Sequence, residues 1–264
     1  MGMLIGCTTD DAPSMLGQKS GFQAYLKTVS PNATFVHCFI RRFALNAKTL
    51  PPELLSCLNQ IIKMVSFVKS LNTRLFARLC EDLGSKHKCL LYHTEVQWLS
   101  RGNMTRRVFE LKNELLAFFR DKNSNFKNDL ESKAFVLMLA YLSDIFEALN
   151  NMNLFFQGPN SFIPDFISEL ETFIRKLDIW MKHMDSRQFR MFQLLSSLPK
   201  QPTEKLCEEI EEIGCHMKQL KTELMHYFPA INCCEYITNP FPVNPSLLPV
   251  GTGEQEDIID IPSD

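Results

Sequence analysis

Apolar residues recur at intervals of three and four positions through most of the chain. This spacing places them on one face of an α-helix, because successive helical residues are separated by about 100°. It predicts one long helix, or two abutting helices, over residues 51–84, where Gly84 supplies a helix end. Further helices are expected over residues 100–120, 130–157 and 203–227 and from about residue 164 onward. The pattern therefore predicts a mainly α-helical protein.

The stretch over residues 51–84 has the longest of these apolar stripes. Its members follow one another without interruption, so we expect all of them to face a core. Trp180 lies in a similar stripe beyond residue 164 and is also expected in the core. The residues of the long stripe are Leu54, Leu58, Ile61, Ile62, Val65, Val68, Leu71, Leu75, Leu79 and Leu83.

The N-terminal stretch of the chain follows a different pattern. Two short apolar runs, residues 3–7 and 34–40, flank a helical stretch over residues 12–27, which predicts a strand, a helix and a second strand. Asp10 and Asp11 follow the first strand directly, where α/β folds often place functional groups. Capping of the following helix is the alternative role for both carboxylates.

Composition and charge narrow the function classes. With 264 residues and 45% hydrophobic content, the chain is long enough to bury a sizeable core in one large or two modest domains. Its 21 Phe against 10 Gly favour packing between helices over a glycine-turned β architecture. A formal net charge of −2 gives no general attraction to nucleic acid or to an anionic membrane. Any DNA contact is therefore expected from a local patch.

The nine cysteines are scattered along the chain rather than arranged as a disulfide framework. Together with the lack of a secretory signal, they indicate a reducing, intracellular compartment. No apolar run reaches the roughly 20 residues of a membrane span, so no membrane partner is expected. Two groups of ligand-type residues lack a full ligand set, and no metal site is expected at either: His37 and Cys38 with Arg41, and His87 and Cys89 with His93.

The segment HTEVQWLSRGNMTRRVFEL, residues 93–111, has the chemistry of a nucleic-acid contact. An extended stretch ends at Trp98, and the helix expected after it opens with donor side chains. An indole offers a stacking surface to a displaced base, and guanidinium groups near a helix N-terminus hold phosphates. The candidate residues are Trp98 for stacking and Arg101, Arg106 and Arg107 for phosphates. A core Trp followed by arginines on a solvated face is the alternative.

Several segments of the chain resemble, in the same order, transposases of the hAT superfamily. The resemblance is strongest to the vertebrate genes derived from them that sit beside BED zinc-finger or SCAN domains, and it covers most of the chain. Residues 98–102 read W-L-S-R-G, as in that family. The other similar segments are CTTDDAPSMLGQKSG (residues 7–21), FVHCFIRRFAL (35–45), LAYLSDIFEALNNMNLFFQG (139–158) and FIRKLDIW (173–180).

The resemblance implies a mainly α fold in three parts. Residues 1–45 would be a partial RNase H-like α/β segment, and residues 46–228 the all-helical domain that hAT enzymes insert into that sheet. Residues 229–264, rich in Pro and Asn and acidic at the end, would form a tail.

The resemblance also places Asp10 at the second acidic position of the catalytic Asp-Asp-Glu triad, with Asp11 in place of the usual Gly. In intact family members the triad holds two divalent cations, such as Mg²⁺, which activate a water or a 3′-hydroxyl. The other two acidic positions have no counterpart in the matched segments. We therefore expect neither enzymatic activity nor a cofactor.

Three interpretations of function stay open at this point. The first is a nuclear, transposase-derived protein that retains DNA binding through Trp98 and the three arginines. The second is a helical protein-interaction module without a DNA role, using exposed faces such as residues 208–212. The third is a fragment of a longer transposase-like protein. The dimerisation region of the family is not among the matched segments, so no oligomeric state is implied.

Overall fold

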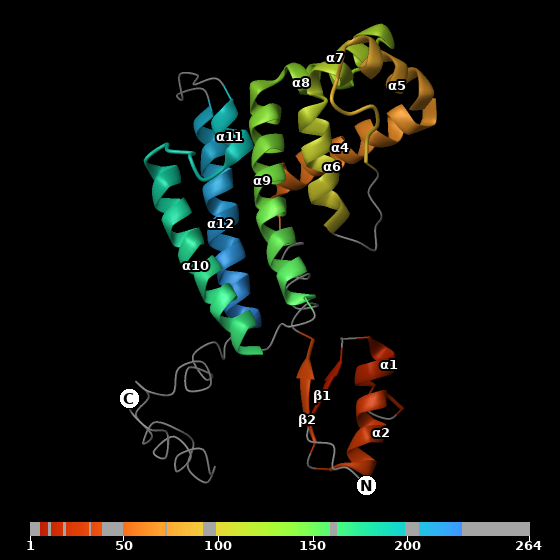
Figure 1. Ribbon diagram of the computed structural model, residues 1–264. Helices are drawn as coiled ribbons and strands as arrows, with labels where there is room; N and C mark the ends of the chain where they lie inside the picture. Colours follow the sequence, from red (N-terminus) through yellow and green to blue (C-terminus); the bar gives the residue numbers. More distant parts are fainter. Residues whose placement is uncertain are drawn as a thin grey trace. The chain divides into compact units, whose positions relative to one another are not determined.

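Figure 1 shows the chain in a computed structural model. It divides into two compact units, Met1–Thr49 and Leu50–Asp264. Asp10, Asp11, Arg41, His93 and Trp98 lie outside the described residues, as does the tail over residues 229–264. The structure describes residues 6–9, 12–17, 20–31, 33–38, 50–71, 73–91, 99–158, 163–198 and 206–228.

The N-terminal unit has the strand-helix-strand order that its sequence predicts. Strands β1 (Gly6–Thr9) and β2 (Thr34–His37) pair in parallel, with Gly6 opposite Thr34 and Thr9 opposite His37. Parallel strands need a crossover connection. Here the described part of the crossover holds two short helices, α1 (Pro13–Leu16) and α2 (Phe22–Val29).

A single helix over residues 12–27 was the wrong expectation, and two glycines explain why. The backbone of Gly21 approaches that of Gly17 so closely that a Cβ atom on Gly21 would lie 2.5 Å from the carbonyl oxygen of Gly17. Only residues without a side chain tolerate such an approach. The stretch is therefore divided into α1, which ends before Gly17, and α2, which begins after Gly21.

The second unit is built from helices, which confirms the prediction of a mainly α-helical protein. Its described elements are α4 (Pro52–Leu71), α5 (Thr73–Asp82), α6 (Leu99–Glu110), α7 (Lys112–Asp121), α8 (Phe126–Glu131), α9 (Lys133–Phe156), α10 (Ile163–Asp185), α11 (Gln193–Ser197) and α12 (Cys207–Tyr227).

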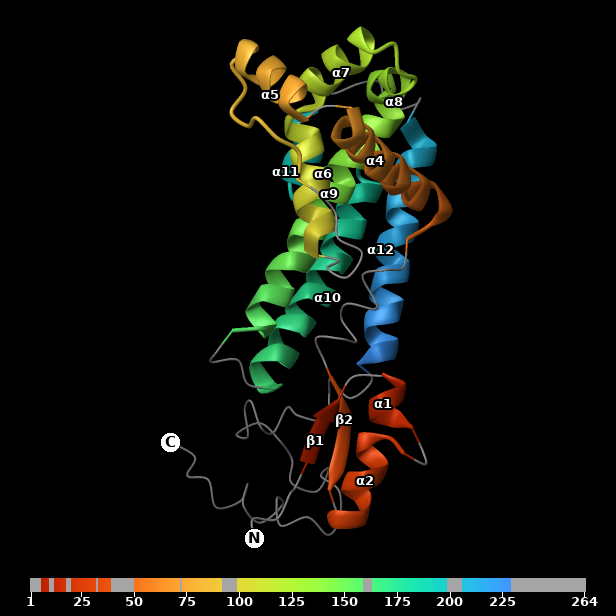
Figure 2. The same cartoon turned by 90° about the vertical axis from the view of Figure 1, so that its right-hand side faces the viewer.

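Helix α9 is the centre of this unit. Every residue from Leu139 to Phe146 is buried, and a helix that is buried on all sides must be covered by others. It contacts α4, α6, α8, α10, α11 and α12. Figures 1 and 2 show α10 and α12 running along α9, whereas α4 crosses it. The hydroxyl of Ser132 begins α9 by accepting the backbone N–H of Phe135 at 3.4 Å.

Helix α4 is the described helix whose length and apolar composition would suffice to cross a bilayer. Its inner residues Leu54, Leu58 and Ile61 are at most 1% exposed, and the helix contacts α6 and α9. A core helix passes the same test of length and composition. The burial of this face therefore accounts for its apolar character.

The long apolar stripe predicted over residues 51–84 does not continue past α4. The chain changes direction after Leu71, and α5 turns Phe76 and Cys80 inward instead. Leu71, Leu75 and Leu83 are 48%, 41% and 54% exposed, so their expected place in the core was wrong. A stripe faces one direction only while the helix axis stays straight, and the second half of this stripe belongs to a separate helix, α5.

One helix over residues 100–120 was also a wrong expectation. Leu111 leaves helical geometry, with φ −100° and ψ 20°, and its buried side chain anchors the bend between α6 and α7. The sequence likewise gave no indication of α8. Beyond the bend, Phe67, Phe118, Phe119 and Phe126 from α4, α7 and α8 form an aromatic cluster with ring centroids 5.4–6.1 Å apart.

Three helix ends share one hydrogen-bond pattern but differ in the residue at its turning point. Helix α7 has this pattern at Asn123, with φ +46° and a bond from the N–H of Ser124 to Phe119 O at 2.9 Å. Helix α5 ends at Gly84, as predicted, with φ +67° and an N–H bond from Ser85 to Cys80 O at 2.9 Å. Helix α10 ends in the same way at Arg187, with φ +54° and a bond from Gln188 to His183 O at 2.8 Å. Glycine is favoured at this position because a side chain costs free energy there.

Candidate nucleic-acid interface

The predicted nucleic-acid site is spread around α6. Trp98 lies outside the described residues, and Arg101, Arg106 and Arg107 all lie within the helix. At about 100° per residue, Arg106 and Arg107 lie roughly 140° and 240° around the helix axis from Arg101. The three guanidinium groups therefore do not share one helical face.

Arg106 and Arg107 are engaged with carboxylates of the protein. Arg106 pairs with Glu147 of α9 and, through Nε, with Glu110 Oε1 at 3.3 Å. Arg107 Nε lies 3.4 Å from Glu110 Oε2, and its Nη1 donates to Cys89 O at 3.0 Å. The two positive charges thus face two negative ones. A phosphate that contacts either arginine would compete with these carboxylates for the guanidinium group.

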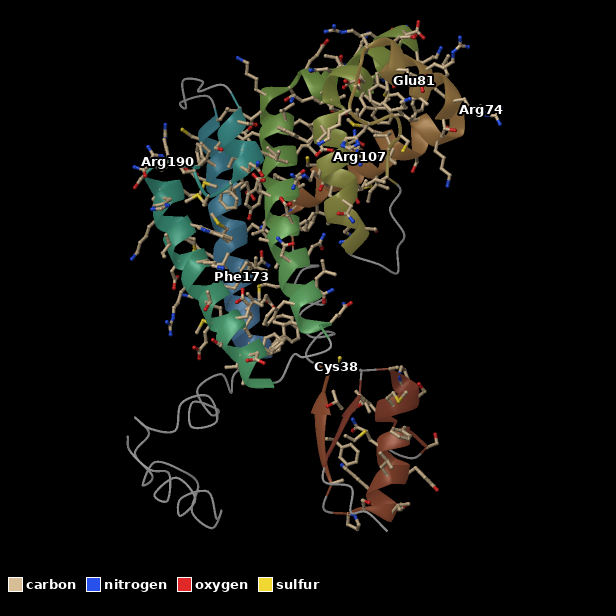
Figure 3. All side chains as sticks on the ribbon, viewed as in Figure 1. Cys38, Arg74, Glu81, Arg107, Phe173 and Arg190 are labelled. Atoms are coloured by element: carbon tan, nitrogen blue, oxygen red, sulfur yellow. The ribbon has the colours of Figure 1, made fainter. Side chains whose placement is uncertain are left out.

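The same network fixes the segment after α5 on the surface of α6. His87 Nε2 lies 3.3 Å from Glu110 Oε2, next to the bond between Arg107 and the backbone of Cys89. The side chain of Arg107 is only 17% exposed. Figure 3 shows Arg107 among the packed side chains of the helical unit, whereas Arg74 and Arg190 project from its edge. The role visible for Arg107 is to join two segments of the chain.

Arg101 differs from the other two arginines. Its Nε is buried and has no hydrogen-bond partner, and burial lowers the pKa of its guanidinium. It lies in the first turn of α6, where backbone N–H groups and the helix dipole favour an anion. Of the three arginines, Arg101 is the one whose position at the helix N-terminus suits an anionic ligand.

Gly102 has a packing role that the sequence reading missed. A Cβ atom at this position would lie 2.6 Å from Nδ2 of Asn150 and 3.1 Å from Cβ of Phe146, both on α9. The hydroxyl of the fully buried Thr105 donates to the carbonyl oxygen of Gly102 at 3.0 Å. Gly102 therefore lets α6 approach α9 closely at this position. The only sequence signal was a glycine inside a helical pattern.

Two polar residues of the segment over residues 139–158 join α9 to later helices. Tyr141 and His216 of α12 are both buried, and the Tyr hydroxyl lies 2.6 Å from His216 Nδ1. The carboxylate of Asp144 accepts the N–H groups of Leu194 and Leu195 at 3.0–3.1 Å and so caps α11. Contacts within the fold therefore account for both Tyr141 and Asp144.

Replacing Asp144 with Asn is expected to flatten the dependence of stability on pH in the weakly acidic range. Burial raises the pKa of the Asp144 carboxyl above its ordinary value. The folded state therefore holds this proton more tightly than the unfolded state. The stability contribution is fully present below the unfolded pKa of about 4 and is lost as the pH rises through the folded pKa. Urea denaturation of the wild-type chain and of Asp144→Asn between about pH 4 and pH 7 measures this difference in stability. Parallel profiles of unfolding free energy against pH would contradict the prediction.

The residues considered as metal ligands do not assemble into a site in the described part of the chain. No group of three or more His, Cys, Asp or Glu side chains there has an arrangement that could hold a metal ion. Burial raises the pKa of the Cys57 thiol to about 12 and that of the Cys80 thiol to about 11. Both thiols are therefore protonated at neutral pH and act as small core residues. Asp10 lies outside the described residues.

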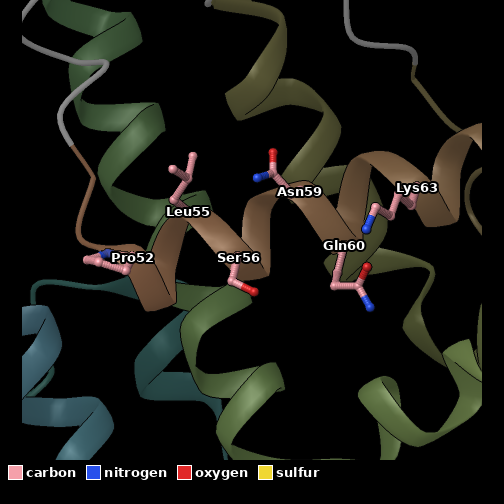
Figure 4. Close-up of a pocket in the computed structure, with 6 residues that line it drawn as sticks. All are labelled: Pro52, Leu55, Ser56, Asn59, Gln60 and Lys63. Carbon is pink, nitrogen blue, oxygen red and sulfur yellow. The ribbon is translucent and has the colours of Figure 1, made fainter.

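A shallow pocket lies along the outer face of α4 (Figure 4). Its volume is about 520 Å³, and the Nε2 group of Gln60 donates to Asp129 Oδ2 at 3.4 Å beside it. Lys63 is the one charged residue of its lining, and a single lysine does not make a catalytic or metal-binding site. The lining residues are Pro52, Leu55, Ser56, Asn59, Gln60 and Lys63.

The helices packed around α9 form a helical domain, and most of this domain matches a model of a known protein family. The model described as the FAM200/GTF2IRD2 helical domain matches residues 37–185, more than half of the chain. The chain therefore belongs to the FAM200/GTF2IRD2-like family, which is related to domesticated hAT transposases. The match begins at the last residue of β2 and ends with α10, so α11 and α12 lie beyond it. No solved structure matches the chain.

Proposed function

We propose that this chain is a non-catalytic, nuclear protein derived from a hAT transposase of the type that accompanies BED zinc-finger or SCAN domains. The helical unit would then correspond to the insertion domain, and β1 with β2 to part of an RNase H-like sheet. The family membership and the parallel pairing of β1 and β2 support this assignment. Asp10 is the one triad position with a counterpart in the matched segments, which supports the lack of catalysis.

We further propose that the helical unit binds other proteins rather than DNA. The observation that carries this proposal is the engagement of Arg106 and Arg107 by Glu110 and Glu147. DNA affinity comes largely from cations that replace the counterions of phosphates, and a cation already paired within the protein contributes less. The end of α9 exposes neighbouring apolar side chains, Leu154 at 60% and Phe155 at 45%, which suit a protein partner.

DNA binding through the start of α6 is the second candidate. The position of Arg101 in the first turn of α6 supports it, because a guanidinium near a helix N-terminus suits a phosphate. Trp98 would supply the stacking surface beside it. A DNA site at this place would depend on Arg101 far more than on Arg106 or Arg107.

Fluorescence anisotropy with labelled double-stranded and single-stranded DNA separates the two candidates. At about 25 mM NaCl, where phosphate contacts are strongest, we expect no saturable binding by the full chain. The double variant Glu110→Gln/Glu147→Gln should gain affinity, because it releases both arginines. The same DNA should remain uncut when Mg²⁺ or Mn²⁺ is added.

Matched variants decide the outcome if the wild-type chain does bind. Binding that weakens about ten-fold in Arg101→Gln or Trp98→Ala, and not in the exposed control Arg175→Gln, would establish the DNA candidate. It would overturn the proposal that the unit binds only proteins. Metal-dependent cleavage abolished by Asp10→Asn would overturn the proposed lack of catalysis.

A further inference from the structure

A second, deeper cavity lies at the end of the helical unit where α9 begins. Its volume is about 740 Å³, within the range of about 300–1,000 Å³ that is typical of small-molecule sites. The end of α8, the first turns of α9, the segment after α10, α11 and the start of α12 all contribute to its walls. Apolar side chains make up much of the lining, among them Leu130, Val136, Leu137, Leu195 and Ile210.

The charged residues around this cavity are mostly cationic. Lys133, Arg187 and Arg190 line it, and Glu131 is the acidic residue of the lining. Glu131 is already paired with Arg120, whose Nη2 lies 2.6 Å from its Oε1. Arg190 is exposed and projects from the edge of the helical unit (Figure 3). An apolar cavity with an excess of positive charge is therefore complementary to a ligand that is apolar at one end and anionic at the other.

Arg187 occupies its place at a cost in free energy. Its φ of +54° lies in the left-handed region, where a residue with a side chain is disfavoured, and Gly84 stands at the equivalent end of α5. Its Nη2 lies 3.1 Å from the Sγ atom of Cys207 at the start of α12. This contact directs the guanidinium along the wall of the cavity. A strained residue that lines a cavity is a frequent sign of a ligand site.

We propose that this cavity binds a small amphipathic anion, a compound with an apolar body and a single carboxylate, sulfonate or phosphate group. The apolar body would lie against Val136, Leu137 and Leu195, and the anionic group would face Arg187 and Arg190. This site is separate from α6, so the proposal does not depend on whether the helical unit binds DNA or protein.

Probe binding to the full chain tests the proposal. The fluorescent sulfonate 8-anilinonaphthalene-1-sulfonate should bind with a stoichiometry of one, and the fatty acid myristate should displace it. Tetradecanol, the neutral counterpart of myristate, should bind about five-fold more weakly, since one partly exposed ion pair contributes a factor of this order. Raising NaCl from about 50 to about 500 mM should weaken myristate binding and leave tetradecanol binding unchanged.

Three variants and a control locate the ligand. Val136→Trp fills the cavity and should abolish the displacement of the fluorescent sulfonate by myristate. Arg190→Gln should remove most of the preference for myristate over tetradecanol. Arg175→Gln removes another exposed charge, on α10, and should change nothing. Arg187→Gly should raise the melting temperature by relieving the left-handed strain and at the same time weaken myristate binding.

The opposite results would overturn the proposal. They are an absence of saturable probe binding, unchanged binding in a folded Val136→Trp, or equal effects of Arg190→Gln and Arg175→Gln. If Val136→Trp fails to fold, Arg187→Gly decides the question. A purely structural role for Arg187 predicts the rise in melting temperature with no change in myristate affinity.

Discussion

Replacing Tyr141 with Ala is expected to lower the free energy of unfolding by about 4 kcal/mol, within the range measured for truncation of buried aromatic residues. Tyr141 is completely buried in α9, and its ring meets that of Phe192 edge-on with centroids 5.6 Å apart. The variant leaves a cavity and also removes the hydroxyl that contacts His216. Urea denaturation followed by far-UV circular dichroism measures the change.

Tyr141→Phe is the control that isolates the hydrogen bond from the packing. It keeps the ring and removes only the hydroxyl, so it should cost about 1 to 3 kcal/mol, the penalty for leaving a buried polar group without its partner. A cost for Phe equal to that for Ala would mean that the hydrogen bond alone accounts for the effect. A cost near zero for both would contradict the central position of α9 in the core.

Replacing Gly102 with Val is expected to lower the free energy of unfolding by about 3 kcal/mol, at the upper end of overpacking effects. Even a Cβ atom at this position would lie 2.6 Å from Nδ2 of Asn150 and 3.1 Å from Cβ of Phe146. The helices α6 and α9 must separate to admit a larger side chain, and this exposes residues of both. Thermal and urea denaturation measure the loss.

Gly214 in α12 provides a matched control for Gly102. Both glycines lie inside helices, but a Cβ atom at Gly214 would meet nothing within 4 Å. Gly214→Val should therefore change stability by less than about 0.5 kcal/mol, because Val has a slightly higher helix propensity than Gly. Equal losses in the two variants would contradict the assignment of the cost at Gly102 to its contact with α9.

The result at Gly102 also bears on how DNA-binding data are interpreted. A substitution in the W-L-S-R-G segment that separates α6 from α9 would abolish any ligand binding by unfolding the site. Loss of binding is informative about DNA only in variants that keep the stability of the wild-type chain. Arg101→Gln satisfies this better than any change at Gly102, because Arg101 donates no hydrogen bond through its Nε.

The pattern of apolar residues predicted the helices well where packing is continuous. The buried stripe of α4 and the helical spans of α9 and α10 follow from spacing alone, since each buries one periodic set of side chains. The division between α4 and α5 agrees with the alternative of two abutting helices, whereas the break at Leu111 was missed because the apolar spacing runs through it. The change of direction after α4 and at Leu111 depends on contacts with other helices. The spacing of apolar residues along the chain carries no information about such contacts.

The candidate site was harder to predict than the fold. The sequence placed Arg106 and Arg107 beside Trp98, but not the contacts of Arg106 with Glu147, 41 positions away. Short helix α11 was missed because the carboxylate that caps it, Asp144, is about 50 positions earlier. The cavity beside Arg190 combines five segments of the chain. Each of these features depends on residues distant in sequence, which no local pattern contains.

The place of α9 at the centre of the helical unit affects how the protein is made. The His216 that pairs with Tyr141 is added to the growing polypeptide 75 residues later. At a translation rate of roughly 5–20 residues per second, the apolar surface of α9 stays uncovered by α12 for about 4 to 15 s during synthesis. During that interval the nascent chain is open to chaperones, and a message truncated before α12 would produce a polypeptide prone to aggregation.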